Sequence, residues 1–160
     1  MAWQNEMTTI VRHLINDTDE SSPTFTNSRL ETSILVSAQL MNNEVNFGKT
    51  YTISVDGCSL SPDPTVDTKD NAFINLVSLR AGCIIVSSEI KTAGANLISV
   101  SDGPSSINMT ATLNGLKIVY EDIKERYETA KLQYQAGGNI GEAVLSPYSL
   151  RQQDSRYRGW

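Results

Sequence analysis

The sequence predicts a mainly α-helical chain: a four-helix bundle-like domain with a β-hairpin inserted between helices 2 and 3, and an extended C-terminal arm. Apolar residues recur at helical spacing in four segments, whereas between Val45 and Leu60 they alternate with polar residues. The last segment, 139–160, follows two glycines and has no sustained period. We therefore divide the chain into a helical domain at 1–138, with the hairpin insertion at 45–61, and an arm at 139–160.

The composition is that of one folded domain. The chain has 160 residues, of which 39% are hydrophobic and 19% charged, which argues against both a disordered acidic polymer and a membrane protein. No apolar run approaches the ~20 residues of a bilayer span, and the first residues lack the pattern of a secretion signal. Two cysteines are too few for a disulfide framework, so we expect a reducing cytoplasmic setting without a membrane.

The net charge of −5 is unevenly placed. Residues 1–70 hold ten acids and four bases, whereas residues 144–160 hold three arginines and one aspartate. Phosphate neutralisation drives general nucleic-acid binding, so an acidic body does not favour that function. An acidic domain could still surround DNA without binding it tightly.

Two amphipathic helices are predicted at the start of the chain. Residues 5–16 place five apolar side chains on one face, namely Met7, Ile10, Val11, Leu14 and Ile15. Turn-forming residues from Asn16 to Pro23 follow. The capping box Ser28-Arg-Leu-Glu31 predicts the start of the second helix, whose inward residues are Leu30, Ile34, Ala38 and Met41.

A β-hairpin is predicted next. Apolar residues alternate along the first strand (Val45, Phe47, Tyr51, Ile53, Val55) and continue with Cys58 and Leu60 beyond the turn signal Asp56-Gly57. An isolated two-stranded ribbon is marginal in water. We therefore expect it to lean on the helices or on another subunit.

The third predicted helix begins after Asp67 or Thr68 and reaches about Thr92. It is apolar on most sides, which is typical of a helix in the middle of a core. Ala93-Gly-Ala-Asn96 is expected to end it, and residues 97–106 are expected to be an extended link.

The fourth predicted helix, from about Met109 to Tyr134, carries a heptad seam. Its members are Leu113, Leu116, Tyr120, Ile123, Tyr127, Ala130 and Tyr134. Packing within the chain is the favoured interpretation of this seam, and an intersubunit coiled coil is the alternative. Buried tyrosine hydroxyls need polar partners, so some of the tyrosines should lie at an edge or an interface. Gly137-Gly138 suits a helix stop.

The C-terminal arm is the one candidate binding site. Its candidate partner-binding residues are Pro147, Tyr148, Leu150, Arg151, Arg156, Tyr157, Arg158 and Trp160. Tyrosine, tryptophan and arginine are enriched where partners bind. We expect the arm to become ordered on a partner, and a disordered end is the alternative.

Catalysis finds little support in the residues. The chain has one histidine, His13, and no Cys-x-x-Cys, so an ordinary zinc site is not expected. No glycine-rich phosphate loop occurs, and the acidic group Asp17, Asp19 and Glu20 lacks the spacing of an EF-hand. We therefore predict that the protein is not an enzyme, with no catalytic residue, no bound metal and no cofactor.

The opening of the chain resembles the head–tail connector (adaptor) proteins of tailed bacteriophages. In this opening the resemblance rests on Val11-Arg-His-Leu-Ile-Asn-Asp17, on Phe25-Thr-Asn27 and on Leu30-Glu31 leading to Ala38. The apolar third helix, the extended link predicted from Ile98 to Met109 with Ser101-Asp-Gly-Pro-Ser-Ser106, and the long charged helix also resemble the family. Members of the family often carry a Leu-x-Asp motif followed by a Tyr-x-Asp motif, where x is any residue. In this chain Phe25 stands in place of the tyrosine and Asn27 in place of the second aspartate. The similarity covers roughly residues 5–135 and leaves out the hairpin and the arm.

The resemblance implies a helical subunit of a homo-oligomeric ring, a dodecamer, in the neck of a virion assembled in the host cytoplasm. The ring would dock on the portal protein, extend the channel for double-stranded DNA and receive the stopper or another neck or tail protein. In the family such termini commonly hold the ring to the portal, so the arm is expected there, and the tail-side partner is the alternative. A helical adaptor or regulatory protein that binds a host or viral partner through its tail remains the second hypothesis.

Overall fold

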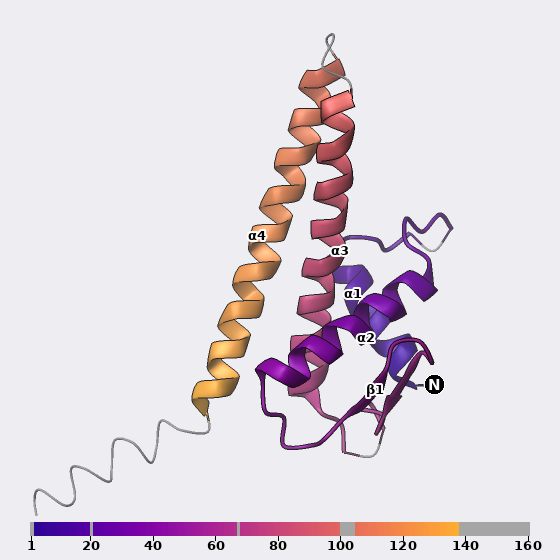
Figure 1. Ribbon diagram of the computed structural model, residues 1–160, viewed down its shortest axis with the longest axis vertical. Coiled ribbons are helices and arrows are strands. Elements are labelled where there is room, and N and C mark those ends of the chain that lie inside the picture. Colours follow the sequence, from indigo (N-terminus) through magenta and orange to yellow (C-terminus); the bar gives the residue numbers. More distant parts are fainter. Residues whose placement is uncertain (1, 20, 67, 100–104, 138–160) are drawn as a thin grey trace, which may run out of the picture.

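The computed structural model is mainly helical, with one small two-stranded antiparallel sheet (Figure 1). It describes residues 2–19, 21–66, 68–99 and 105–137. The elements in these residues are α1 (Ala2–Leu14), α2 (Asn27–Glu44), β1 (Thr52–Ser54), β2 (Ser59–Ser61), α3 (Asn71–Ser99) and α4 (Ser105–Gly137). The arm at 139–160, with all eight of its candidate binding residues, lies outside the described residues.

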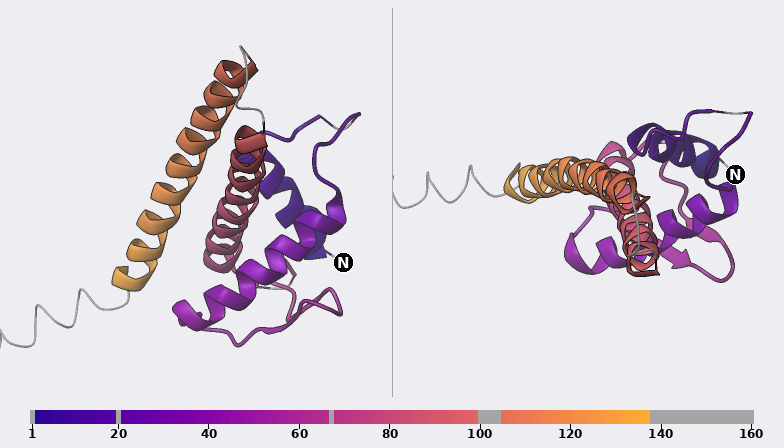
Figure 2. Two further views of the ribbon diagram at one scale, coloured as in Figure 1. Left: turned by 45° about the horizontal axis from the view of Figure 1, so that its top comes forward. Right: turned by 90° about the horizontal axis from the view of Figure 1, so that it is seen from above.

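Helix α3 is the central element. It packs against each of the other three helices, with α1 and α2 on one side and α4 on the other (Figures 1 and 2). Its apolar composition, predicted to suit the middle of a core, is explained by these neighbours. The C-terminal part of α3 and the N-terminal part of α4 extend beyond α1 and α2 as a helical hairpin (Figure 1).

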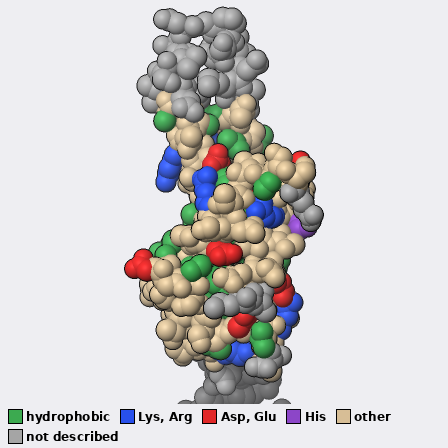
Figure 3. Space-filling model, turned by 90° about the vertical axis from the view of Figure 1, so that its right-hand side faces the viewer, with side chains coloured by type: hydrophobic (Ala, Val, Ile, Leu, Met, Phe, Trp, Pro, Cys, Tyr) green, Lys and Arg blue, Asp and Glu red, His purple; other side chains and the backbone are tan. Residues whose placement is uncertain are grey.

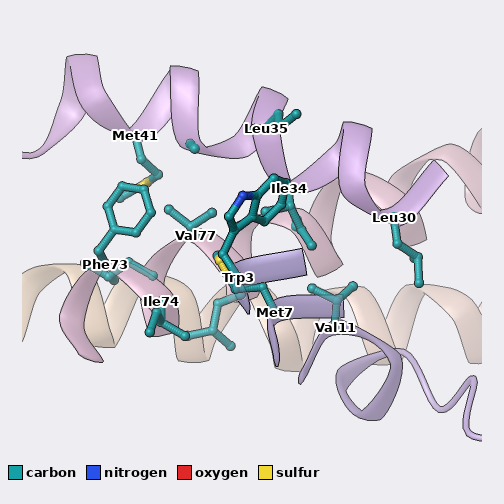
Figure 4. Packing of buried hydrophobic residues seen from close by; sticks show 14 of the residues in the cluster. Trp3, Met7, Val11, Leu30, Ile34, Leu35, Met41, Phe73, Ile74 and Val77 are labelled. Carbon is teal, nitrogen blue, oxygen red and sulfur yellow. The ribbon is translucent and has the colours of Figure 1, made fainter. Parts of the chain in front are cut away.

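The core lies where α1, α2 and α3 meet (Figure 4). One face of α1 is fully buried at Trp3, Met7 and Val11, residues spaced four apart. Fully buried residues of the other two helices include Leu30, Ile34, Leu35, Ala38, Met41, Phe73 and Val77. The four inward residues predicted for the second helix are therefore all in the core.

Helix α1 begins earlier than the predicted range of 5–16, because its first turn is docked. The Trp3 side chain is fully buried, and its backbone N–H donates to the Asp63 carboxylate at 3.2 Å. The helix ends at Leu14 because Asn16 adopts left-handed backbone angles, with φ of 58°.

The predicted capping box at the start of α2 is wrong. The N-cap is Thr26, whose hydroxyl accepts the Arg29 N–H at 3.3 Å, and Ser28 already lies within the helix. Glu31 accepts instead from the Gln4 side chain of α1, at 3.5 Å. The sequence holds two overlapping cap signals, and the loop before Thr26 determines which one is used.

The hairpin is shorter than predicted. Its strands pair at three positions, with Ile53 opposite Leu60, and four residues from Val55 to Cys58 form the turn in place of a tight Asp56-Gly57 turn. Cys58 has a left-handed φ of 46°. Residues 45–51 are not a strand, but Val45, Phe47 and Tyr51 are buried, and the Phe47 and Phe73 ring centroids lie 5.0 Å apart. The hairpin region therefore packs against the helices, as predicted.

Both ends of α3 differ from the prediction. Asp70, not Asp67 or Thr68, caps the helix, since its carboxylate accepts the Phe73 N–H at 3.0 Å. The helix does not end at 93–96 but continues to Ser99, and α4 begins at Ser105. Residues 97–99 and 105–106 of the predicted extended link are therefore helical. Glycine and asparagine lower helix propensity by only about 1 kcal/mol or less each, so they do not by themselves end a helix.

Helix α4 is longer than the predicted 109–134. Its 33 residues correspond to about 50 Å at 1.5 Å per residue. It ends at Gly137, the first residue of the predicted Gly137-Gly138 stop. Gly115 does not interrupt it, since one glycine lowers helix stability by only about 1 kcal/mol against alanine.

Candidate functional site

The most connected group of charged side chains in the described chain surrounds Glu44, the last residue of α2. Its carboxylate accepts from Arg80 Nη1 at 2.6 Å, from Lys131 Nζ at 2.7 Å and from the Tyr127 hydroxyl at 3.0 Å. Arg80 lies on α3, and the other two donors lie on α4. We call these four residues the Glu44 cluster; it joins three helices through one carboxylate.

The two cations of the cluster, Arg80 and Lys131, both lie near the Tyr127 ring. Arg80 is the one charged residue between Asn71 and Ser88, and its guanidinium lies 5.7 Å from the centroid of the Tyr127 ring. Lys131 Nζ lies at the same distance from that centroid. The Tyr127 hydroxyl is also 2.8 Å from Arg80 Nη1. Both cations therefore lie within cation–π distance of the same aromatic ring.

The electrostatics of the cluster favour a fixed ion network. The hydrogen bond from Lys131, followed by those from Arg80 and Tyr127, lowers the pKa of Glu44 to about 2 in spite of its partial burial. Burial raises the pKa of Tyr127. At neutral pH Glu44 is an anion, the tyrosine is a neutral donor and the two bases are cations. None of these groups is poised for proton transfer near neutral pH, so the arrangement is suited to holding helices together.

A cleft of about 330 Å³ opens beside the cluster, between α3 and α4. Cys83 and Tyr120 are among its lining residues. Burial raises the pKa of the Cys83 thiol to about 11, so it is protonated at neutral pH. A protonated thiol is a poor nucleophile, and the cleft therefore offers no activated cysteine.

A second polar network closes the loop between α1 and α2. The Asp17 side chain is buried, and it accepts from Arg12 and from the backbone N–H of Thr24 at 2.8 Å. Arg12 Nη2 donates to the Asn27 side chain at 2.7 Å and to the Phe25 carbonyl at 2.8 Å. One guanidinium thus holds both polar positions of the motif that resembles the connector family, Asp17 and Asn27.

The structure places the heptad seam of α4 against α3 within one chain. Ile123 and Tyr127 are buried, whereas Leu116, Tyr120 and Tyr134 are partly exposed. Ile123 lies opposite Gly82 of α3. The Tyr134 ring lies 5.7 Å from the Phe47 ring, and its hydroxyl donates to the Asn46 carbonyl at 3.5 Å.

Sequence reasoning missed the Glu44 cluster and the role of Arg12. A signal for the cluster was present, because an isolated arginine in an apolar helix needs a buried or half-buried anion as a partner. Which acid would meet Arg80 depends on how α2 crosses α3, which the sequence pattern does not specify.

The described residues also bear on metal binding and on membrane insertion. Among them, no group of three or more His, Cys, Asp and Glu side chains could hold a metal ion. Asp19, from the acidic loop, accepts the backbone N–H of Ser21 at 2.9 Å.

One helix of the described chain, at Asn71–Ala95 in α3, is long and apolar enough to cross a membrane. The prediction that no apolar run approaches this length is therefore wrong. Of its most apolar stretch, 56% is buried within the molecule. Its position in the core accounts for this composition.

Comparisons of the chain with models of protein families, with curated proteins and with solved structures return no match.

Proposed function

We propose that this chain is the head-to-tail adaptor of a tailed-phage virion. In this proposal a four-helix bundle-like domain assembles as a dodecameric ring in the neck, docks on the portal protein and extends the DNA channel towards the stopper or tail. The arm at 139–160 binds the portal. The protein is a structural component and not an enzyme.

The observation that carries the proposal is the network around Arg12. The residues that carry the resemblance to connector proteins, Asp17 and Asn27, lie ten residues apart in the sequence and bind the same guanidinium. An asparagine oxygen accepts a hydrogen bond from arginine as a carboxylate oxygen does. The replacement of the family's second aspartate by Asn27 is therefore compatible with the same loop closure.

Charge supports a channel that DNA passes through without being held. Twelve copies at −5 each carry a net charge of about −60, and a field of that sign does not attract phosphate. The positive residues of the arm, Arg151, Arg156 and Arg158, are instead available for a protein partner.

The Glu44 cluster supports a structural role over an enzymatic one. Its charged groups are satisfied by one another, and none is tuned to exchange a proton near neutral pH. Residues of this kind fix the angle between helices, which a ring subunit needs in order to close at a defined number of copies.

The second hypothesis is a helical adaptor or regulator that binds a host or viral partner through its C-terminal tail. The aromatic and arginine content of residues 147–160 favours partner binding in either case. The two hypotheses differ in the partner and in the number of copies bound.

The test combines the full chain with the portal protein of the same virus and measures the mass and shape of the complex by mass photometry and electron microscopy. We expect a closed ring seated on the portal. The paired change Tyr157→Ala and Trp160→Ala should abolish seating, whereas Gln152→Ala, also in the arm, should not. A defined complex with a host protein, and none with the portal, would establish the second hypothesis in place of the first.

A further inference from the structure

The cleft between α3 and α4, beside the Glu44 cluster, contains polar groups that have no partner in the described chain. Its volume is about 330 Å³. The Ser87 and Tyr120 hydroxyls in its lining form no hydrogen bond with a described residue, and Lys124 forms no ion pair with one. Ile84, which is partly buried, adds an apolar surface. A cleft of this kind suits an aromatic side chain that carries a polar end.

The C-terminal arm begins at the edge of this cleft. Gln135 Nε2, near the end of α4, donates to the Glu44 carbonyl at 3.3 Å, and Glu44 lines the cleft. Helix α4 ends two residues later, at Gly137. The chain from there to Tyr157 spans at most about 66 Å, whereas Tyr127 in the cleft lies about 15 Å back along α4. The arm is therefore long enough to return to the cleft of its own chain.

Three exposed acidic residues of α4 form no ion pair within the described chain, namely Glu121, Glu125 and Glu128; the ion pairs of this helix use other residues. Glu128 lines the cleft. Glu121 is seven residues earlier, so it lies on the same side of the helix, whereas Glu125 lines a separate groove that faces α1. The rim of the cleft therefore offers two unpaired carboxylates, about 10 Å apart along the helix axis.

We infer that Arg156-Tyr157-Arg158 of the same chain binds in this cleft. The Tyr157 ring packs on Ile84, and its hydroxyl accepts a hydrogen bond from Lys124. The two arginines, about 7 Å apart along an extended chain, pair with Glu121 and Glu128 through their long side chains. The contact thus joins the unpaired groups of the cleft to the residue types that the arm supplies.

Charge and sequence favour this segment and this side of the molecule. Residues 144–160 hold three arginines and one aspartate, and neither of the other two aromatic residues of the arm, Tyr148 and Trp160, is preceded by an arginine. On the side that carries α1 and α2, acidic and basic side chains are scattered among uncharged surface (Figure 3). An arm with an excess of arginine is therefore attracted to the unpaired acids of α4 more than to that side.

The arm then has two alternative partners, because in the proposed function the same residues bind the portal. While the arm occupies the cleft, Tyr157 and its flanking arginines are covered, and the portal must compete with the cleft for them. The docking itself does not depend on the proposed function, whereas the competition with the portal rests on it.

Alkylation of Cys83, which lines the cleft, tests the docking, and Cys58 in the β-hairpin is the internal reference. Full-length wild type, Tyr157→Ala and Tyr148→Ala are treated with iodoacetamide, and modification of each cysteine is followed by peptide mass spectrometry. Because the arm shields the cleft, Cys83 should react about fivefold faster in Tyr157→Ala than in the wild type. Tyr148→Ala is the matched control and should react as the wild type does. Cys58 should react equally in all three proteins.

A second pair of variants tests the charge. Glu121→Gln removes a proposed partner of the arm, and Glu125→Gln makes the same change on another side of α4. Only Glu121→Gln should speed the alkylation of Cys83, and salt should reduce the protection in the wild type because it screens exposed ion pairs. Both side chains are exposed, so circular dichroism should show unchanged helix content in both variants.

Portal affinity tests the competition. A chain whose arm is released more often binds a partner of the arm more tightly, by the factor by which the free fraction rises. Glu121→Gln should therefore bind the portal more tightly than Glu125→Gln, by the same factor as its increase in the Cys83 alkylation rate. Equal portal affinities would show that cleft and portal do not compete for the arm.

Three outcomes would overturn the docking. They are equal Cys83 rates in the wild type and Tyr157→Ala, equal acceleration by Tyr157→Ala and Tyr148→Ala, and a protection that increases with protein concentration, which would place the arm in another copy. The docking and the proposed function fail separately. A ring on the portal without protection of Cys83 keeps the adaptor and rejects the docking, whereas protection without a ring keeps the docking and rejects the adaptor.

Discussion

The Tyr127 hydroxyl of α4 lies 3.0 Å from the carboxylate of Glu44 at the end of α2. The two residues are 83 positions apart in the sequence, and α3 reaches the same carboxylate through Arg80 at 2.6 Å. The position of the C-terminal half of α4 therefore depends on one acidic side chain together with the packing of the seam.

Tyr127→Phe should test the contribution of this hydroxyl. The change keeps the ring that contacts Arg80 and Lys131 but removes the hydrogen bond to Glu44, so we expect a loss of about 1 kcal/mol in the free energy of unfolding. Urea unfolding monitored by circular dichroism measures it. Tyr120→Phe is the control, since that hydroxyl has no hydrogen bond to another described residue; an equal loss in both variants would contradict the role of the cluster.

The stability of the cluster should depend on pH in the acidic range. The folded-state pKa of Glu44 is about 2, below the ordinary value of 4.5, so the ionised carboxylate is favoured by folding. Its contribution is therefore complete above pH 4.5 and is lost as the pH falls towards 2. The urea midpoint of the wild type should exceed that of Glu44→Gln at pH 6, and the difference should shrink between pH 4.5 and pH 2. A difference that is constant over this range would show that Glu44 is not held as an ion.

Helix content and the inward faces of α1 and α2 were predictable because they depend on local periodicity. Trp3 was missed since the pattern of its helix was read from residue 5, and a single tryptophan at a chain end carries no period. The start of α2 was misread because Thr26 and Ser28 are both good caps, and only the loop closed by Arg12 selects Thr26.

The Glu44 cluster could not be predicted in full for a different reason. Arg80 was visible as an isolated charge, but Glu44, Tyr127 and Lys131 come from helices whose crossing angles arise from side-chain packing. The extension of α3 to Ser99 was missed for another reason, because Gly94 and Asn96 were taken as a stop although their low helix propensity costs only about 1 kcal/mol or less each.

Two buried serines should respond differently to alanine. Ser37 and Ser78 are both fully buried, but the Ser37 hydroxyl donates to the Val77 carbonyl at 2.8 Å, whereas the Ser78 hydroxyl has no partner among the described residues. Ser37→Ala should therefore cost about 1 kcal/mol, while Ser78→Ala should be neutral or stabilising because it removes an unsatisfied polar group. Thermal unfolding of the two variants is the comparison, and the reverse order would show that Ser78 has a partner.

Gly82→Ala should stabilise the α3–α4 contact. A Cβ at this position would lie 3.5 Å from Cγ2 of Ile123 and 3.8 Å from Cβ of Leu14, which are ordinary van der Waals distances. Alanine is favoured over glycine in a helix by about 1 kcal/mol. A gain of that order in the free energy of unfolding is expected, and Gly115→Ala, in open space on α4, should give the helix-propensity gain alone. A loss at Gly82 with a gain at Gly115 would indicate that α3 and α4 approach more closely than these distances.

Ile123→Asp should unfold or severely destabilise the domain. Ile123 is 2% exposed and packs on α3 at Gly82, so the change removes apolar burial and places a carboxylate in an apolar contact between the two helices. The expected cost is at least about 3 kcal/mol. Ile118→Asp is the matched control, because it is the same substitution on the same helix at a residue that is 68% exposed, and it should change stability by less than about 0.5 kcal/mol at low protein concentration. If the two variants unfold at the same urea concentration, α4 does not pack on α3 through its heptad seam, and the contact between the helices must use another face.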